Sequence, residues 1–167
     1  MVPFCYTDRY MKIKKPLWLI GSVVISQLAG ALGALATTPN IDGWYSTLNK
    51  PFFNPPNWIF GPVWTTLYTM MGVALYLVLT AKKTDTKKTA ITLFLVHLVV
   101  NSLWSIVFFG LQQPGFALII ITLLWLMIAK LIKLFNKLNV WAGRLLWPYL
   151  AWVSFASLLN LFIWRLN

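Results

Sequence analysis

Residues 89–110 read TAITLFLVHLVVNSLWSIVFFG and contain no Asp, Glu, Lys or Arg. About 20 apolar helical residues cross the hydrocarbon core of a bilayer, so this run predicts a transmembrane helix. Four further apolar runs lie on either side of it, at about 17–36, 60–81, 115–135 and 145–164. The sequence therefore predicts an all-α membrane protein: a single domain over residues 1–167, built as a bundle of five transmembrane helices behind a basic N-terminal tail (1–16).

The composition favours the bilayer over nucleic acid as the partner. Hydrophobic residues make up 59% of the chain and charged residues only 10%, against roughly 25% charged residues in soluble domains. The net charge of +11 would suit nucleic acid only if the basic residues clustered on a soluble fold. They lie instead between the apolar runs, so we expect no nucleic-acid partner.

The positions of the basic residues predict the orientation. Lys50 and Arg165 lie on one side of the predicted membrane, and twelve basic residues lie on the other: Arg9, Lys12, Lys14, Lys15, Lys82, Lys83, Lys87, Lys88, Lys130, Lys133, Lys137 and Arg144. Short loops rich in Lys and Arg stay in the cytoplasm. We therefore expect the N-terminus and the second and fourth loops to be cytoplasmic in a bacterial inner membrane, with the first loop outside.

The N-terminal run has a second interpretation. MKIKKPLWLI from Met11, followed by GALATT, has the form of a signal peptide with a small-residue cleavage site at Ala34-Leu35-Ala36, which would leave four spans. We favour an uncleaved helix, because it explains the alternation of charge equally well. Met11 also resembles a natural start. Cys5, the only cysteine, excludes an internal disulfide and a cysteine-based metal cluster.

Small residues recur every fourth position in the first run, as Ser22, Ser26, Gly30 and Ala34, with Ala29 and Gly33 on a neighbouring stripe. Such ladders let helices approach closely in lipid. Two interpretations are open: packing within the subunit, which we favour, and a homodimer interface.

The few polar residues inside the spans should point into the bundle, because lipid does not solvate them. Asn101 shares a helical stripe with His97 and Ser105, and Asn160 shares one with Trp152 and Ala156; Gln27 is a further candidate. The asparagines either tie helices together, at about 0.6–2 kcal/mol per hydrogen bond, or supply the oriented polar groups of an apolar ligand pocket. For His97 we favour a structural hydrogen bond over haem ligation, and we predict no metal site.

Tryptophan is in excess, with ten residues. Five lie near span ends, where aromatic belts form: Trp18, Trp58, Trp141, Trp147 and Trp164. We expect Trp125 to face lipid or a neighbouring helix. Trp64, Trp104 and Trp152, with Trp44 from the first loop, are predicted to converge in the outer half of the bundle, where indole rings suit a flat aromatic ligand.

The first loop continues into KPFFNPPNWIFGPVW (50–64), with four prolines and five aromatic residues. Prolines at this density prevent a regular helix. A stiff apolar segment loses little conformational freedom when it closes over a ligand. The sequence therefore predicts a lid.

WYSTLNKPFFNPPNWIFGPVWTTLY (44–68), NSLWSIVFFG (101–110) and GRLLWPYLAWVSFASLLNLFIWRLN (143–167) together resemble the TspO/MBR family, the tryptophan-rich sensory proteins and translocator proteins. The resemblance covers the chain from residue 17 onwards. It implies a five-helix membrane bundle, usually dimeric, that binds porphyrins and synthetic benzodiazepine-type or isoquinoline ligands. It further implies a link to tetrapyrrole transport, sensing or breakdown, and permits an outer-membrane location in some bacteria.

Carried over position by position, the resemblance implies a ligand site whose residues match the family pattern: Trp44, Tyr45, Pro55, Pro56, Trp64, Asn101, Trp104, Trp152, Ala156 and Asn160. Protoporphyrin IX or haem would be the ligand, with no cofactor required. Trp44 and Trp152 match two tryptophans implicated in porphyrin photodegradation, and they would be the catalytic residues if that reaction occurs.

Two departures from the mammalian pattern matter. The fifth run ends Leu161-Phe162-Ile163-Trp164-Arg165 without the expected tyrosine, and cholesterol motifs are weak patterns even when complete, so specific cholesterol binding is doubtful. Phe116 and Ile120 stand where mammalian members carry Trp and Asp, so ligand affinities need not transfer.

We therefore expect a membrane protein that binds porphyrin-type tetrapyrroles, with a transport or sensing role. One alternative is a light-dependent, porphyrin-degrading enzyme. Another is a regulatory membrane protein that acts through partners without turnover. The spans contain no carboxylate pair or nucleophile–base pair to support conventional catalysis.

Overall fold

The computed structural model describes residues 15–167, and no β-strand occurs among them. The long helices are α1 (Pro16–Ile41), α3 (Phe60–Thr80), α4 (Asp85–Ser105), which continues as the π-helix η2 (Ile106–Gly110), α5 (Pro114–Leu138) and α7 (Trp147–Leu166). Short helices are α2 (Trp44–Thr47), the 3₁₀-helix η1 (Asn57–Ile59) and α6 (Val140–Arg144). Five helical segments are long and apolar enough to cross a membrane, which confirms the predicted all-α five-helix membrane bundle.

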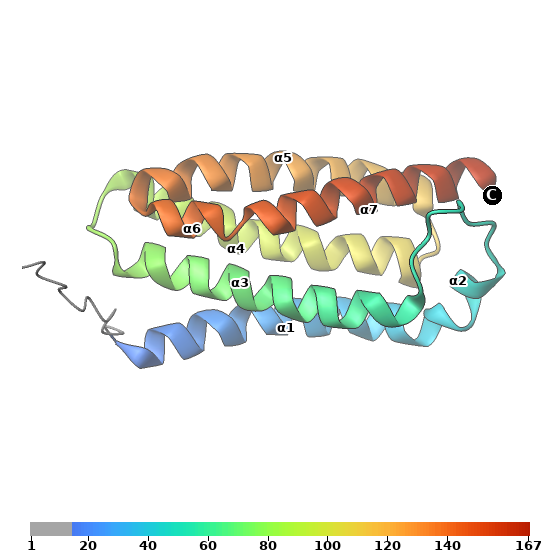
Figure 1. Ribbon diagram of the computed structural model, residues 1–167, viewed down its shortest axis with the longest axis horizontal. Helices are drawn as coiled ribbons and strands as arrows, with labels where there is room; N and C mark the ends of the chain where they lie inside the picture. Colours follow the sequence, from blue (N-terminus) through green and yellow to red (C-terminus); the bar gives the residue numbers. More distant parts are fainter. Residues whose placement is uncertain (1–14) are drawn as a thin grey trace, which may run out of the picture.

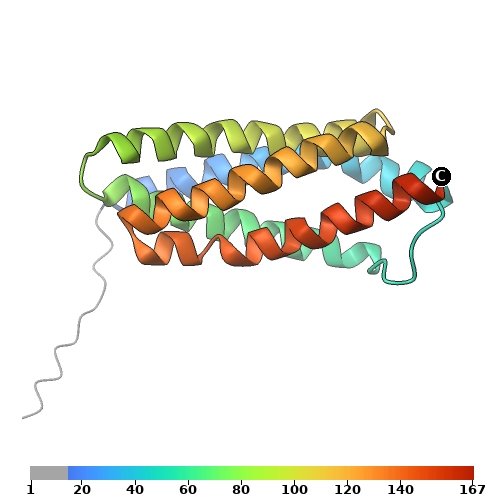
Figure 2. The ribbon, with the colours of Figure 1, turned by 90° about the horizontal axis from the view of Figure 1, so that it is seen from above.

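The helices run roughly along one long axis (Figures 1 and 2). α1 packs against α3 and α4, and α5 packs against α4 and α7. The first loop with α2, the α4–α5 connection and the C-terminus lie at one end of the bundle (Figure 1). The α3–α4 connection and α6 lie at the other end. Below, these are called the first-loop end and the α6 end.

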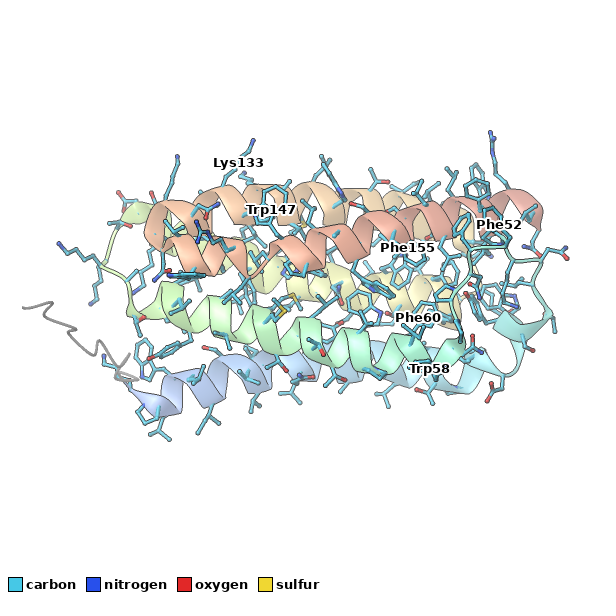
Figure 3. The ribbon with its side chains drawn as sticks, viewed as in Figure 1. Phe52, Trp58, Phe60, Lys133, Trp147 and Phe155 are labelled. Carbon is cyan, nitrogen blue, oxygen red and sulfur yellow. The ribbon has the colours of Figure 1, made fainter. Side chains whose placement is uncertain are left out.

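Basic and aromatic residues are distributed differently between the two ends of the bundle. Lys82 and Lys83 lie in the α3–α4 connection and Arg144 in α6, whereas Lys50 lies in the first loop. Figure 3 places Lys133 and Trp147 toward the α6 end and Phe52 and Trp58 toward the first-loop end. The predicted segregation of basic residues is therefore present in the described chain. Arg9, Lys12, Lys14 and Cys5 lie outside the described residues.

α1 is longer than predicted, since it ends at Ile41 rather than near residue 36 and passes through Pro39. Side chains support this last turn: Thr37 Oγ1 donates to the Gly33 carbonyl at 3.0 Å, and Asn40 Nδ2 donates to the Ala36 carbonyl at 2.9 Å. One proline removes a single backbone donor. The extension carries α1 to the level of the first loop.

α4 starts at Asp85, four residues before the predicted start at 89, because Thr84 caps it. The Thr84 side chain accepts a hydrogen bond from the Lys87 amide at 3.2 Å, and Asp85 places a negative charge beside the positive end of the helix dipole. The break between the fourth and fifth spans also differs, because it contains α6. The Asn139 side chain caps α6 by accepting from the Trp141 amide at 2.9 Å.

Small residues bring α1 close to α3 and α4. Ser22, Ser26, Ala29 and Gly33 are the buried residues of α1. A Cβ atom added to Gly72 of α3 would lie 2.5 Å from Val23 Cα, so the two backbones are in contact there. Ser102 Oγ of α4 donates to the Ala29 carbonyl at 2.8 Å. These small residues therefore pack within the subunit, and the homodimer stays a prediction.

Candidate ligand-binding site

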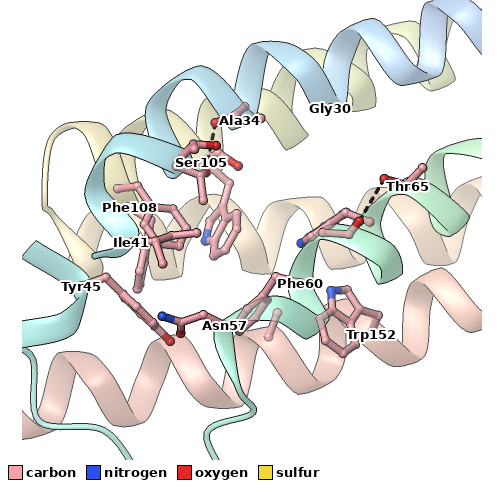
Figure 4. A pocket seen from close by; sticks show the side chains of 18 of the residues that line it. Gly30, Ala34, Ile41, Tyr45, Asn57, Phe60, Thr65, Ser105, Phe108 and Trp152 are labelled. Atoms are coloured by element: carbon pink, nitrogen blue, oxygen red, sulfur yellow. Dashed lines mark hydrogen bonds between the residues drawn. The ribbon is translucent and has the colours of Figure 1, made fainter. Parts of the chain in front are cut away.

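A cavity of about 460 Å³ lies between α1, α3, α4 with η2, and α7, in the half of the bundle nearest the first-loop end (Figure 4). Its volume falls within the range of small-molecule pockets, about 300–1,000 Å³. We call it the central cavity.

α1 forms one wall from small side chains. Gly30, Ala31, Gly33 and Ala34 line the central cavity, and the extended last turn adds Thr37, Thr38 and Ile41. A Cβ atom on Gly30 would overlap the ring of Tyr68 on the facing helix α3. Gln27 Nε2 links α1 to α3 by donating to the Thr65 carbonyl and to Thr69 Oγ1, both at 3.0 Å. Space in this wall therefore depends on glycine and alanine.

Aromatic rings form the opposite walls. Trp64 and Tyr68 of α3 stack at 5.5 Å between centroids, with 28° between their planes. Trp104 and Phe108 stack at 5.4 Å and also at 28°. All four line the central cavity, together with Phe60, Phe109, Tyr45 and Trp152. Stacked rings of this kind present broad apolar faces to a ligand.

The π-helix η2 brings two consecutive phenylalanines to the wall. The Leu111 amide donates to the Ile106 carbonyl at 2.8 Å across this five-residue turn. Phe108 and Phe109 both line the central cavity, with ring centroids 4.8 Å apart. π-turns of this type occur frequently at functional sites. The wide turn therefore widens the aromatic wall beyond what an α-helical stripe would supply.

Asn160 and Trp104 both line the central cavity, and they are hydrogen-bonded to each other. Trp104 Nε1 donates to Asn160 Oδ1 at 3.1 Å, and Asn160 Nδ2 donates to the Pro114 carbonyl at 2.7 Å. Asn160 thus ties α7 to α4 and to the start of α5. Both ends of its amide are engaged within the protein.

Asn101 does not line the central cavity, which corrects its predicted place in the wall. It lies behind Tyr68, whose hydroxyl donates to Asn101 Oδ1, and its Nδ2 donates to the Tyr149 hydroxyl at 2.8 Å. His97 completes this buried group, with Nε2 3.0 Å from the Tyr149 hydroxyl and Nδ1 3.0 Å from the Phe94 carbonyl. His97 is therefore buried, with both ring nitrogens within hydrogen-bond distance of a partner.

The first loop contributes Tyr45 and Asn57 to the wall of the central cavity at the first-loop end. Tyr45 is held from outside: its hydroxyl donates to Asn54 Oδ1 at 2.7 Å, and Lys50 Nζ lies 5.0 Å from its ring centroid. Burial raises the pKa of Tyr45 to about 12. The loop is also fastened to α7, since Asn167 Nδ2 donates to the Asn49 carbonyl at 3.1 Å.

Three predicted loop residues are not in the wall. Trp44 does not line the central cavity, and it packs edge-on against the wall residue Phe108, with ring centroids 5.7 Å apart. Pro55 and Pro56 precede η1 and also lie off the wall. Each proline restricts the backbone conformation just before η1 and so helps to position Asn57 and Phe60 in the wall.

The structure thus brings together six of the predicted site residues in the wall: Tyr45, Trp64, Trp104, Trp152, Ala156 and Asn160. Sequence reasoning missed Tyr68, Phe60 and Phe109 as wall residues. Tyr68 carried a usable signal, since it follows Trp64 by four positions on the same helical face. Trp125, outside the wall, is 37% exposed and its Nε1 donates to Ser154 Oγ at 2.8 Å, so it faces both a neighbouring helix and the surroundings.

Within residues 15–167, no group of three His, Cys, Asp or Glu side chains comes close enough to hold a metal ion. The side chains that line the central cavity supply aromatic rings, indole N–H groups, hydroxyls and amides.

The fold and the cavity together define a multi-pass integral membrane protein with an aromatic pocket between its helices. The chain belongs to the TspO/MBR family, whose model matches residues 22–165. It is 42% identical over 155 residues to the tryptophan-rich protein TspO of Chlorobaculum tepidum, covering 92% of this chain and 98% of that one. It is 39% identical over 140 residues to the tryptophan-rich sensory protein of Cereibacter sphaeroides (82% and 87% covered). It is also 38% identical over 146 residues to the human translocator protein (84% and 86% covered).

Proposed function

We propose that this protein binds porphyrin-type tetrapyrroles, or similar flat apolar molecules such as benzodiazepine-type or isoquinoline ligands, in the central cavity, and that binding serves sensing or transport. The observation that carries the proposal is the aromatic wall formed by Trp64, Tyr68, Trp104 and Phe108. Two stacked ring pairs in one apolar cavity suit a large conjugated ligand better than a small polar one.

The relatives support the biological part of this proposal. One is named a tryptophan-rich sensory protein and another a translocator protein. Their identities of 38–39% over most of each chain make a related role in a membrane the simplest proposal for this chain.

Tryptophan fluorescence tests binding directly. Protoporphyrin IX is titrated in the dark into purified protein in lipid nanodiscs. Because three tryptophans line the central cavity, we expect saturable quenching with one porphyrin per chain. The control is an unrelated tryptophan-rich helix bundle in the same nanodiscs. Quenching that rises linearly without saturation, to the same extent in both samples, would argue against the proposal.

Light-dependent porphyrin breakdown is a second candidate, favoured by the position of Trp152 in the wall. In this reaction the excited porphyrin would take an electron from the Trp152 indole. Dioxygen would then add across a methine bridge of the porphyrin, open the macrocycle and leave both oxygen atoms in the product, while an electron returns to the indole. The same sample is illuminated, and the Soret band is followed. Light-dependent loss of the band that is abolished in Trp152→Phe would support this chemistry. The loss should persist in Trp44→Phe, because Trp44 does not line the cavity. A stable band would exclude the reaction.

A further inference from the structure

Trp152 has a buried polar group that the fold leaves without a partner. Among residues 15–167, its Nε1 is the one buried side-chain nitrogen or oxygen atom that makes no hydrogen bond. The Trp152 side chain also lines the central cavity (Figure 4). Buried donors in proteins nearly always have an acceptor, so this N–H calls for an explanation.

The neighbouring rings cannot supply that acceptor. Phe60 packs edge-on against Trp152 at 6.0 Å between ring centroids, and Phe155 lies 5.5 Å away. Both side chains consist of carbon and hydrogen only. An acceptor for the Trp152 N–H therefore has to come from outside this ring cluster.

Two other polar side chains of the cavity wall are already engaged within the protein. Asn160 bonds with Trp104 and with the Pro114 carbonyl. Tyr68 donates its hydroxyl to Asn101. A ligand that recruited any of these groups would have to break a hydrogen bond inside the protein, whereas a bond to Trp152 would satisfy a donor that has none.

We propose that Trp152 Nε1 donates a hydrogen bond to an acceptor oxygen of the bound ligand, a carboxyl or carbonyl group, and that the central cavity thereby selects flat aromatic ligands that carry such a group. This inference rests on the proposed binding of tetrapyrroles. An indole N–H can only donate, so it distinguishes an acceptor-bearing ligand from its hydrocarbon counterpart.

The test uses two porphyrins that differ only at this chemistry. Mesoporphyrin IX carries two propionate side chains, and etioporphyrin III carries ethyl groups in their place. Dissociation constants for both are measured with wild type and with Trp152→Phe in the same nanodiscs. The variant keeps an aromatic ring but removes the N–H. Comparing the four constants cancels the different partitioning of the two porphyrins into lipid.

We expect Trp152→Phe to weaken mesoporphyrin IX binding about tenfold, as for loss of a hydrogen bond to a charged acceptor, and to change etioporphyrin III binding less than about twofold. Trp125→Phe is the matched control, because Trp125 lies outside the cavity wall; it should leave both constants unchanged. An equal loss for both porphyrins would overturn the hydrogen bond while leaving tetrapyrrole binding intact. Failure of wild type to bind either porphyrin would overturn both proposals.

A spectroscopic measurement covers the case in which Trp152→Phe fails to fold. Wild-type protein with ¹⁵N-labelled indole groups gives one N–H resonance per tryptophan, and Trp152 is assigned by selective labelling or by photochemical modification. Both porphyrins produce similar ring-current shifts, so the difference between them isolates hydrogen bonding. A downfield shift of the Trp152 resonance with mesoporphyrin IX alone is the expected result, and identical shifts with both would contradict the proposal.

Discussion

Gly30 lies where α1 passes the ring of Tyr68, and its hydrogen atom is all that fits there. A methyl group there would overlap Cε2 of the Tyr68 ring. It would also lie 2.6 Å from Cδ2 and 3.0 Å from Cζ of the same ring. Tyr68 cannot move away freely, because its hydroxyl is bonded to buried Asn101. We expect Gly30→Ala to lower stability by about 1–3 kcal/mol and to weaken porphyrin binding.

Thermal unfolding and the dissociation constant are measured on the same preparation. Gly21→Ala, on the same helix, is the control: a Cβ there would meet nothing within 4 Å, and alanine favours a helix by about 0.5–1 kcal/mol over glycine. Unchanged stability and binding in Gly30→Ala would contradict the close approach of α1 to Tyr68.

Tyr45 gives a pH-dependent prediction. Burial raises its pKa to about 12 from the ordinary value of about 10, so the folded state favours the neutral phenol. Its contribution to stability is fully present below about pH 10 and is lost as the pH rises toward about 12. Subtracting the phenolate absorbance titration of Tyr45→Phe from that of wild type should leave one group ionising near pH 12. A difference curve centred near pH 10 would contradict the burial of the Tyr45 side chain.

For single residues, the sequence predicted well which side chains face the inside of the bundle. It predicted less well which hydrogen-bond partners those side chains have. Helical spacing placed both Asn101 and Asn160 on inward faces, and both are buried. It could not show that Tyr68 and Tyr149 surround Asn101 while Asn160 reaches the wall, because those partners come from helices far away in the chain. The unpartnered Trp152 N–H was equally invisible, since it depends on two phenylalanine neighbours.

The elements of the bundle depend on local signals that hydropathy does not detect. Thr84 caps α4 and sets its start. Hydrogen bonds from side chains stabilise the last turn of α1, which continues past Pro39 to Ile41. The π-helix η2 was not predictable from the sequence. A continuous apolar run gives no signal for the position at which an α-helix changes to a π-helix. That turn decides whether Phe109 reaches the cavity wall.

The cap of α4 can be tested by one substitution. Thr84→Ala removes the side-chain acceptor for the Lys87 amide and leaves only the Thr84 carbonyl, 3.1 Å away. We expect a cost of about 1 kcal/mol, seen as a lower unfolding temperature. Thr89→Ala in the same helix is the control, because the Thr89 hydroxyl only back-bonds to the Asp85 carbonyl at 3.1 Å on an exposed surface. Equal effects of the two substitutions would show that the cap does not set the start of α4.

For the molecule as a whole, the sequence predicted the architecture well. Backbone groups in lipid have no water to bond, so apolar runs of this length are forced into helices. The homodimer and the choice of membrane stay predictions, because neither follows from packing within one chain. Orientation stays a prediction too, although basic residues gather at the α6 end.

Orientation can be measured with a membrane-impermeant maleimide, in a Cys5→Ser background. Phe52→Cys in the first loop and Lys83→Cys in the α3–α4 connection both replace exposed residues. We expect intact cells to label the first variant only and permeabilised cells to label both, because loops rich in lysine stay in the cytoplasm. Labelling of Lys83→Cys alone in intact cells would reverse the proposed topology.

The central claim is that the cavity between α1, α3, α4 and α7 holds the ligand, and filling that cavity tests it most directly. Ala156 of α7 lines the cavity and is 7% exposed, whereas Ala151 of the same helix faces outward. Ala156→Phe and Ala151→Phe are titrated with protoporphyrin IX beside wild type. Loss of saturable binding in Ala156→Phe, with wild-type affinity in Ala151→Phe, is the predicted result; wild-type affinity in Ala156→Phe would contradict the account.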